Sequence, residues 1–217
     1  MIFMKITLLL DNPNSWMLPY ARLLEKSLQE CGHMVTWCNK AADMPTGDCA
    51  FFLSCEEIVS EKIRERNQHN IVIHASALPK GKGWSPMTWQ ILEGKNEIPL
   101  TLFEAEDQVD SGTIYLTDAV SLEGHELIDE MRALLGKKII ALALRFIEEY
   151  PPKKSKPQTG KESFYPRRGK KDSELDPQKT IAEQFNLLRV ADNERYPCFF
   201  RIHNKKYLIK IYKQGEK

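Results

Sequence analysis

Four short apolar runs in the first third of the chain constrain its fold more than any other feature. They occupy residues 6–10, 35–37, 50–53 and 71–73, and turns or helical patterns separate them. The first run, Ile-Thr-Leu-Leu-Leu, shows no polar alternation, which is typical of a strand buried on both faces of a parallel sheet. Strands that alternate with helices predict a doubly wound α/β fold, a mainly parallel sheet with helices on both faces.

The rest of the first 150 residues supplies the helices that such a sheet needs. Apolar residues recur at helical spacing over 17–28, and Gly32 follows where a helix would end. A charged surface helix is expected over 58–66, and an apolar stripe predicts a long helix over 126–149. Two further strands are expected at 98–103 and 113–116.

The composition changes sharply after residue 150. Residues 151–163 are rich in proline and lysine with almost no apolar side chains, which predicts a linker between a main domain, 1–150, and a small α+β region, 164–217. In the tail, a short helix precedes two alternating segments joined by His203-Asn204-Lys205, which predicts a hairpin. This region is too short for a strong core, so we expect it to pack on the main domain.

The bulk composition excludes several classes of protein. Lysine plus arginine number 31 and aspartate plus glutamate 30, which argues against a protein that coats nucleic acid. No apolar run could span a bilayer and the first residues do not resemble a signal peptide, so we expect a cytoplasmic protein. The five cysteines include no CxxC pair, so neither a disulfide framework nor a metal site is expected.

Two polar residues follow strands of the expected sheet. His74 ends the fourth apolar run, and Asp110 follows the strand at 98–103. Ligands of such sheets bind beyond the carboxyl ends of the strands, and a neutral imidazole can accept a proton from a nucleophile. A carboxylate beside it would fix its tautomer. Each residue also has an ordinary explanation, since a histidine can be structural and Asp-Ser-Gly is a common turn.

A glycine-rich cationic loop lies between these two residues. Lys80-Gly81-Lys82-Gly83 precedes a helix start at Ser85-Pro86, and Trp84 stands between them. Glycines permit close backbone approach, and a helix amino end with two lysines suits a phosphate. The alternative is a solvated, flexible loop, with the tryptophan at the edge of the core.

At these residues the chain resembles the folate-dependent formyltransferase family. The signature Asn-x-His-x-Ser-x-Leu-Pro is matched from His74 to Pro79, and the later Asp-x-Gly is matched by Asp110-Ser111-Gly112. The similarity extends over about residues 6–116 and implies a Rossmann-like formyltransferase fold, with 1–150 as the catalytic domain. The tail from Phe164 resembles the small carboxyl-terminal region of the sugar-modifying members.

The resemblance implies formyl transfer from N10-formyltetrahydrofolate, without a metal, to an amine. His74 would be the general base, assisted by Asp110, with Ser76 beside them. The pterin would lie near two segments, which contain Ser54, Cys55 and Glu56, and Gln108 and Val109.

The acceptor implied by the resemblance is a nucleotide-linked amino sugar of polysaccharide biosynthesis. Its diphosphate would meet the cationic loop, namely Lys80, Gly81, Lys82, Gly83 and Trp84. A transfer-RNA formyltransferase would be expected to carry a larger basic carboxyl-terminal domain, so no nucleic-acid partner is expected. Family members are often homodimers, and the long helix or the tail could supply an interface.

One position departs from the family pattern. The family places an asparagine two residues before the histidine, where this chain has Val72. That asparagine polarises the formyl carbonyl, so another group must take this role: protonated His74, a backbone N–H or Ser76. Two rival functions follow, a non-catalytic module that binds folate or nucleotide, and a hydrolase of formyltetrahydrofolate.

Overall fold

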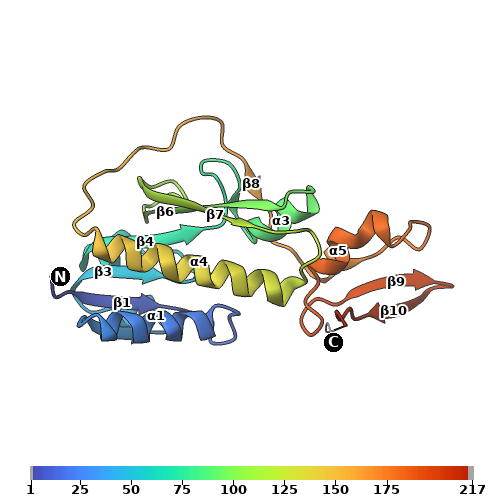
Figure 1. Cartoon of the computed structure of the whole chain (residues 1–217), viewed down its shortest axis with the longest axis horizontal. Coiled ribbons are helices and arrows are strands. Elements are labelled where there is room, and N and C mark those ends of the chain that lie inside the picture. The colour runs from blue at the N-terminus through green and yellow to red at the C-terminus, as the bar shows by residue number, and fades with distance from the viewer. Residues whose placement is uncertain (1, 215–217) are drawn as a thin grey trace.

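The computed structural model describes residues 2–214, which form a six-stranded mixed sheet and a smaller carboxyl-terminal region (Figure 1). The strand order is β2-β1-β3-β4-β6-β7. The parallel strands are β1 (Lys5–Leu9), β2 (Met34–Cys38), β3 (Gly47–Phe52) and β4 (Asn67–His74). Two antiparallel strands, β6 (Glu97–Glu104) and β7 (Ile114–Ser121), complete the sheet. The mainly parallel α/β fold predicted from the sequence is confirmed.

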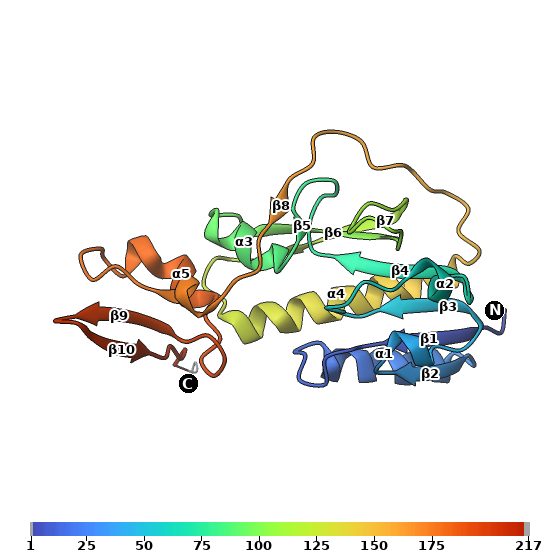
Figure 2. The same cartoon turned by 180° about the vertical axis from the view of Figure 1, so that it is seen from behind.

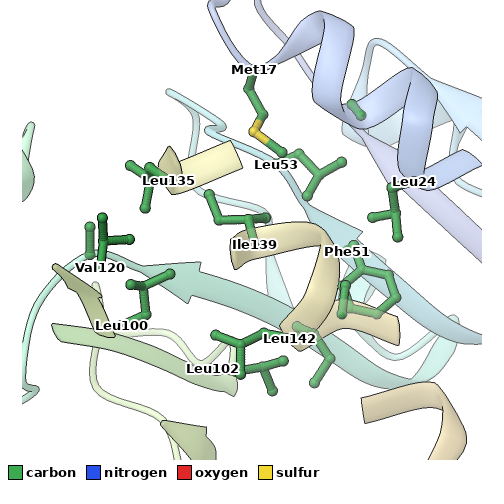
Figure 3. Close-up of a cluster of buried hydrophobic side chains, with 14 of the residues drawn as sticks. Met17, Leu24, Phe51, Leu53, Leu100, Leu102, Val120, Leu135, Ile139 and Leu142 are labelled. Carbon is green, nitrogen blue, oxygen red and sulfur yellow. The ribbon is translucent and has the colours of Figure 1, made fainter. Parts of the chain in front are cut away.

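The main core lies between the sheet and two helices on one face. These helices, α1 (Leu18–Glu30) and α4 (Ile128–Glu148), pack against each other and lie in front of the sheet in Figure 1. Their apolar stripes meet the inward side chains of the strands, and each fully buried large side chain stabilises the fold by about 1.5–3 kcal/mol. Figure 3 shows part of this core, namely Met17, Leu24, Phe51, Leu53, Leu100, Leu102, Val120, Leu135, Ile139 and Leu142.

The opposite face carries a smaller cover. A short 3-10 turn, η1 (Ala41–Asp43), and the single helical turn α2 (Glu61–Arg64) lie over a second apolar cluster, and α2 is visible in Figure 2. The expectation of a helix over 58–66 was therefore wrong in length. Ser60, just before Glu61, is extended, the Arg64 side chain bonds back to the carbonyl of Val59, and the chain enters β4 at Asn67.

The segment after α4, residues 151–163, leads across the edge of the sheet and contacts the main domain. In Figure 1 it arches over β6 and β7 and descends to β8 (Phe164–Tyr165), which pairs in parallel with β5 (Lys82–Gly83). The short helix α3 (Pro86–Leu92) follows β5 directly. We propose the division 1–150, 151–163 and 164–217, with a middle segment that is attached to the main domain at Lys156, Gln158, Glu162 and Ser163.

The carboxyl-terminal region contains η2 (Lys170–Ser173), η3 (Ala182–Gln184), α5 (Phe185–Arg189) and a hairpin of β9 (Cys198–Ile202) and β10 (Lys205–Ile209). The buried guanidinium of Arg189 fastens α5 to the main domain through the Glu126 carboxylate and the Asn96 amide.

The predicted hairpin is confirmed, with a turn of two residues, His203-Asn204; Lys205, which was expected in the turn, begins β10. Both turn residues have positive φ, +48° and +61°, as a type I′ turn requires. None of the helices between residues 2 and 214 is long and apolar enough to cross a membrane.

Gly136→Ala is expected to destabilise the protein, although alanine is ordinarily the better helix former. A Cβ at this position of α4 would lie 2.4 Å from the ring Cγ of Tyr20 in α1. The free energy of unfolding in urea should fall by about 1–3 kcal/mol, as for other overpacked cores. The control Lys137→Ala, on the exposed face, should change it by less than about 0.5 kcal/mol. A more stable Gly136→Ala protein would contradict this close contact.

Candidate active site

His74 is the last residue of β4, and the backbone of the following loop fixes its ring. Its side chain is only 10% exposed, and Nε2 lies 2.9 Å from the carbonyl oxygen of Gly81. A carbonyl can only accept a hydrogen bond, so Nε2 carries the proton in the neutral ring. Nδ1 is then the nitrogen left to accept a proton from a substrate.

Asp110 reaches the same imidazole from the loop after β6. Its Oδ2 lies 3.7 Å from Nε2 of His74 and accepts a hydrogen bond of 2.8 Å from the N–H of Gly83. The residue has φ +53°, in the left-handed region that aspartate tolerates better than most residues. The two residues singled out from the sequence are therefore neighbours, and the carboxylate faces the protonated side of the ring.

Ser76 is buried beside this pair, and its hydroxyl makes no hydrogen bond to the described residues. The residue is 1% exposed, its carbonyl accepts a hydrogen bond from Thr101 Oγ1, and its Oγ has no hydrogen-bond partner among the described residues. A Cβ on Gly81 would lie 3.5 Å from this oxygen. A buried hydroxyl without a partner costs free energy, which an incoming polar group would recover.

Val72 gives the wall near His74 an apolar character. Its side chain packs in a cluster with Leu78, Phe103 and Ile114. The nearby Asn70 does not supply the missing amide, because its Nδ2 donates to the carbonyl of Arg64 at 2.9 Å. Its Oδ1 is buried and has no partner among the described residues.

The cationic loop divides into an outward and an inward half. Lys80 is exposed and Trp84 is 36% exposed, so both can meet a ligand. Lys82 differs from the expectation, because it is 1% exposed and its ammonium is bound by Ser111 Oγ and the Glu162 carboxylate. Because the Lys82 charge is already paired with Glu162, Lys82 is not free to bind a phosphate. Gly81 and Gly83, with φ +73° and +92°, shape the loop.

The first predicted folate segment follows β3. Ser54 is exposed with φ +54°, and Asp11, after β1, caps the segment by accepting from the N–H groups of Glu56 and Glu57. Burial, and secondarily the nearby Asp11 charge, raises the pKa of the Cys55 thiol to about 12. Cys55 is therefore a neutral wall residue and not a nucleophile.

The second predicted folate segment is the exposed loop between β6 and β7. Gln108 and Val109 are both exposed there, immediately before Asp110. Gln108 also lines a polar cleft of about 330 Å³, together with Lys82, Ser111 and Gln158. Within residues 2–214, no three His, Cys, Asp or Glu side chains are grouped to hold a metal ion.

Residues 156–167, which we call the strap, belong to the site, although the sequence predicted a linker over 151–163. Gln158 and Ser163 bond to the backbone of the two active-site loops. Arg167 lies over the Trp84 ring, 4.3 Å from its centroid, and pairs with Glu56 at 2.8 Å. The strap has the composition of a linker. The local sequence feature that could have indicated its ordered position is the aromatic pair Phe164-Tyr165, which forms β8.

The sequence model of the formyl transferase family matches residues 19–138, more than half of the chain. The chain belongs to the formyl transferase family. The methionyl-tRNA formyltransferase of Malacoplasma penetrans is 30% identical over 149 residues, 66% of this chain and 45% of that protein. The chain spans about half the length of the curated relatives it matches.

Two solved structures show that the similarity extends to the whole fold. A methionyl-tRNA formyltransferase from Clostridium thermocellum superposes with a TM-score of 0.81 at 19% identity, covering 98% of this chain and 94% of that chain. A sugar N-formyltransferase from Shewanella sp FDAARGOS_354 gives a TM-score of 0.71 at 14% identity, covering 99% of each chain. At such identities the similarity establishes the architecture. The substrate has to be inferred from the residues of the site.

Cysteine alkylation tests the environment of the first predicted folate segment. Because burial raises the pKa of Cys55 to about 12, almost none of this thiol is ionised at pH 8. Iodoacetamide should therefore label the exposed Cys31 of the native protein and spare Cys55, as read by peptide mass mapping. In denaturant both should react. Equal labelling of the two in the native protein would contradict the raised pKa of Cys55.

Proposed function

We propose that the chain transfers a formyl group from N10-formyltetrahydrofolate to the amino group of a nucleotide-linked sugar. The observation that carries this proposal is the pairing of His74 with Asp110 at the carboxyl edge of the sheet. The Nε2–H of His74 is directed to the Gly81 carbonyl and the Asp110 carboxylate, so Nδ1 is available as a base. The family membership narrows the reaction to formyl transfer.

In this reaction the folate supplies an activated formyl group. The amine nitrogen bonds to the formyl carbon, and negative charge develops on the formyl oxygen. His74 accepts the proton that the amine loses, and Asp110 stabilises the imidazolium. The bond between the formyl carbon and N10 then breaks, and the proton passes from His74 to N10, so atoms and charge balance.

The developing oxyanion needs a hydrogen-bond donor in place of the missing asparagine. The Ser76 hydroxyl is our candidate among the alternatives, because it has no competing hydrogen-bond partner in the described part of the chain. One oriented donor contributes on the order of 3 kcal/mol to such a transition state. The apolar packing around Val72 lowers the local polarity, which strengthens a hydrogen bond made there.

The acceptor would be recognised by groups that face outward from the same edge. Arg167 can form a two-point bond with a phosphate if the ligand replaces Glu56, and Trp84 offers a ring to a base or sugar. The exposed Lys80 adds a second positive charge. An aromatic ring beside two cations suits a nucleoside diphosphate.

A charged transfer RNA is the second candidate for the acceptor. One argument for it is that sequence relatives are methionyl-tRNA formyltransferases. A second is the charge of residues 164–217, which contain thirteen lysines and arginines against seven aspartates and glutamates. Such an excess would favour an RNA backbone and make binding steeply dependent on salt. The amino-sugar proposal rests instead on the contact between Arg167 and Trp84, which directly follows the loop that orients His74.

A direct test incubates the protein with formyltetrahydrofolate and either uridine- and thymidine-diphosphate amino sugars or methionyl-tRNA. We expect a formyl mass increment on one sugar nucleotide, and a loss of about 10²–10⁴-fold in kcat for His74→Ala. The control variant Lys26→Ala, at an exposed position of α1, should retain full rate.

Modification of methionyl-tRNA alone would replace the sugar proposal with the second candidate. Folate deformylation at the full rate with no acceptor would instead identify a hydrolase. Folate binding without either reaction would identify a binding module.

Arg167→Met tests the phosphate assignment. Removal of one charge-assisted bond, worth about 1.5–3 kcal/mol, should raise KM for the sugar nucleotide at least tenfold and leave kcat within about twofold. Arg195→Met, an equal loss of charge at an exposed position, should behave like the parent. An unchanged KM in Arg167→Met would remove Arg167 from the acceptor site.

A further inference from the structure

The strap lies outside the region that the family description matches, yet it contacts both active-site loops. It begins eighteen residues after the end of the match at 138 and runs from Lys156 to Arg167. Figure 2 shows it descending to β8, beside β5. Its side chains are mostly exposed, so its contacts add little to the main core.

Its first attachment is to the loop that holds His74. The N–H of Gly81 donates to Ser163 Oγ at 2.9 Å, and the N–H of Lys82 donates to the Ser163 carbonyl at 2.9 Å. The N–H of Trp84 continues this ladder to the Tyr165 carbonyl. A Cβ on Gly83 would lie 2.6 Å from that same carbonyl oxygen, so glycine permits the close approach. The Gly81 carbonyl, which receives His74, is thereby held from both sides.

Its second attachment is to the loop that presents Asp110. The Nε2 of Gln158 donates to the carbonyls of Asp110 and Gly112, each at 2.9 Å. Lys156 and Ile114 exchange two backbone hydrogen bonds at the start of β7. Asp110 has a left-handed conformation that costs free energy, and these bonds stabilise it.

A buried charge joins the two attachments. The ammonium of Lys82, from the His74 loop, bonds to Ser111 Oγ in the Asp110 loop and to the Glu162 carboxylate in the strap. Three segments that are distant in sequence thus converge on one cation. Because the cation is 1% exposed, separating any one segment would leave it poorly compensated.

We propose that Ser163 and Gln158 are positioning residues, through which the strap sets the geometry of His74 and Asp110. This inference rests on the proposed function, because it assigns a role in that reaction. Neither side chain touches the imidazole. Ser163 acts through the Gly81 backbone, and Gln158 acts through the Asp110 backbone.

The test uses Ser163→Ala, its conservative partner Ser163→Thr, and Gln158→Glu, in which a carboxylate replaces the amide that donates to two carbonyls. Small displacements of reacting groups cost up to about a hundredfold. We expect Ser163→Ala and Gln158→Glu to lower kcat at least tenfold with both KM values within about twofold. Ser163→Thr, which keeps the hydroxyl, should restore the rate. The matched control Gln178→Glu, at an exposed position, should behave like the parent.

Amide hydrogen exchange gives a second readout that needs no turnover. Exchange at Gly81 should accelerate in Ser163→Ala, and exchange around Gly112 should accelerate in Gln158→Glu, with an unchanged melting temperature. Unchanged exchange, or faster exchange with an unchanged kcat, would overturn the positioning role. If the parent protein transfers no formyl group, the proposed function fails, and the exchange result alone decides whether the strap orders the loops.

Discussion

The backbone of residues 81–83 carries the interactions on which the site depends. The Gly81 carbonyl orients His74, the Gly83 N–H holds the Asp110 carboxylate, and the N–H groups of Gly81 and Lys82 bind the strap. Each of these bonds has a fixed direction, so the loop determines which imidazole nitrogen is free. The positive φ values of its two glycines allow a chain of three residues to face an imidazole, a carboxylate and a neighbouring strand at once.

The fold brings these groups together through strand direction. Parallel strands end at one edge of the sheet, and there the chain places the segments that follow β1, β3 and β4. The antiparallel β6 passes His74 at Thr101 and runs on to Glu104, opposite Ile71. The loop that follows then brings Asp110 back to His74. The large core under α1 and α4 supports this edge, and the smaller apolar cluster on the other face includes Val72.

Much of this could be predicted from local patterns. Continuous apolar runs identified the buried strands, and the spacing from His74 to Asp110, with the family resemblance, identified the pair that the structure brings together. The burial of Lys82 could not be predicted, because its partner Glu162 lies eighty residues away in a segment with the composition of a linker. Low apolar content excludes a core, but backbone pairing can still order such a segment.

The proposed transfer requires that folate loses its formyl group only when an amine is present. The decisive measurement is a single-turnover experiment that follows tetrahydrofolate by absorbance and formylated sugar nucleotide by mass, with and without acceptor. The account predicts that the two products appear together, in equal amounts, and only when the acceptor is present. Tetrahydrofolate that appears at the same rate without acceptor would show that water is the nucleophile and would contradict transfer to an amine.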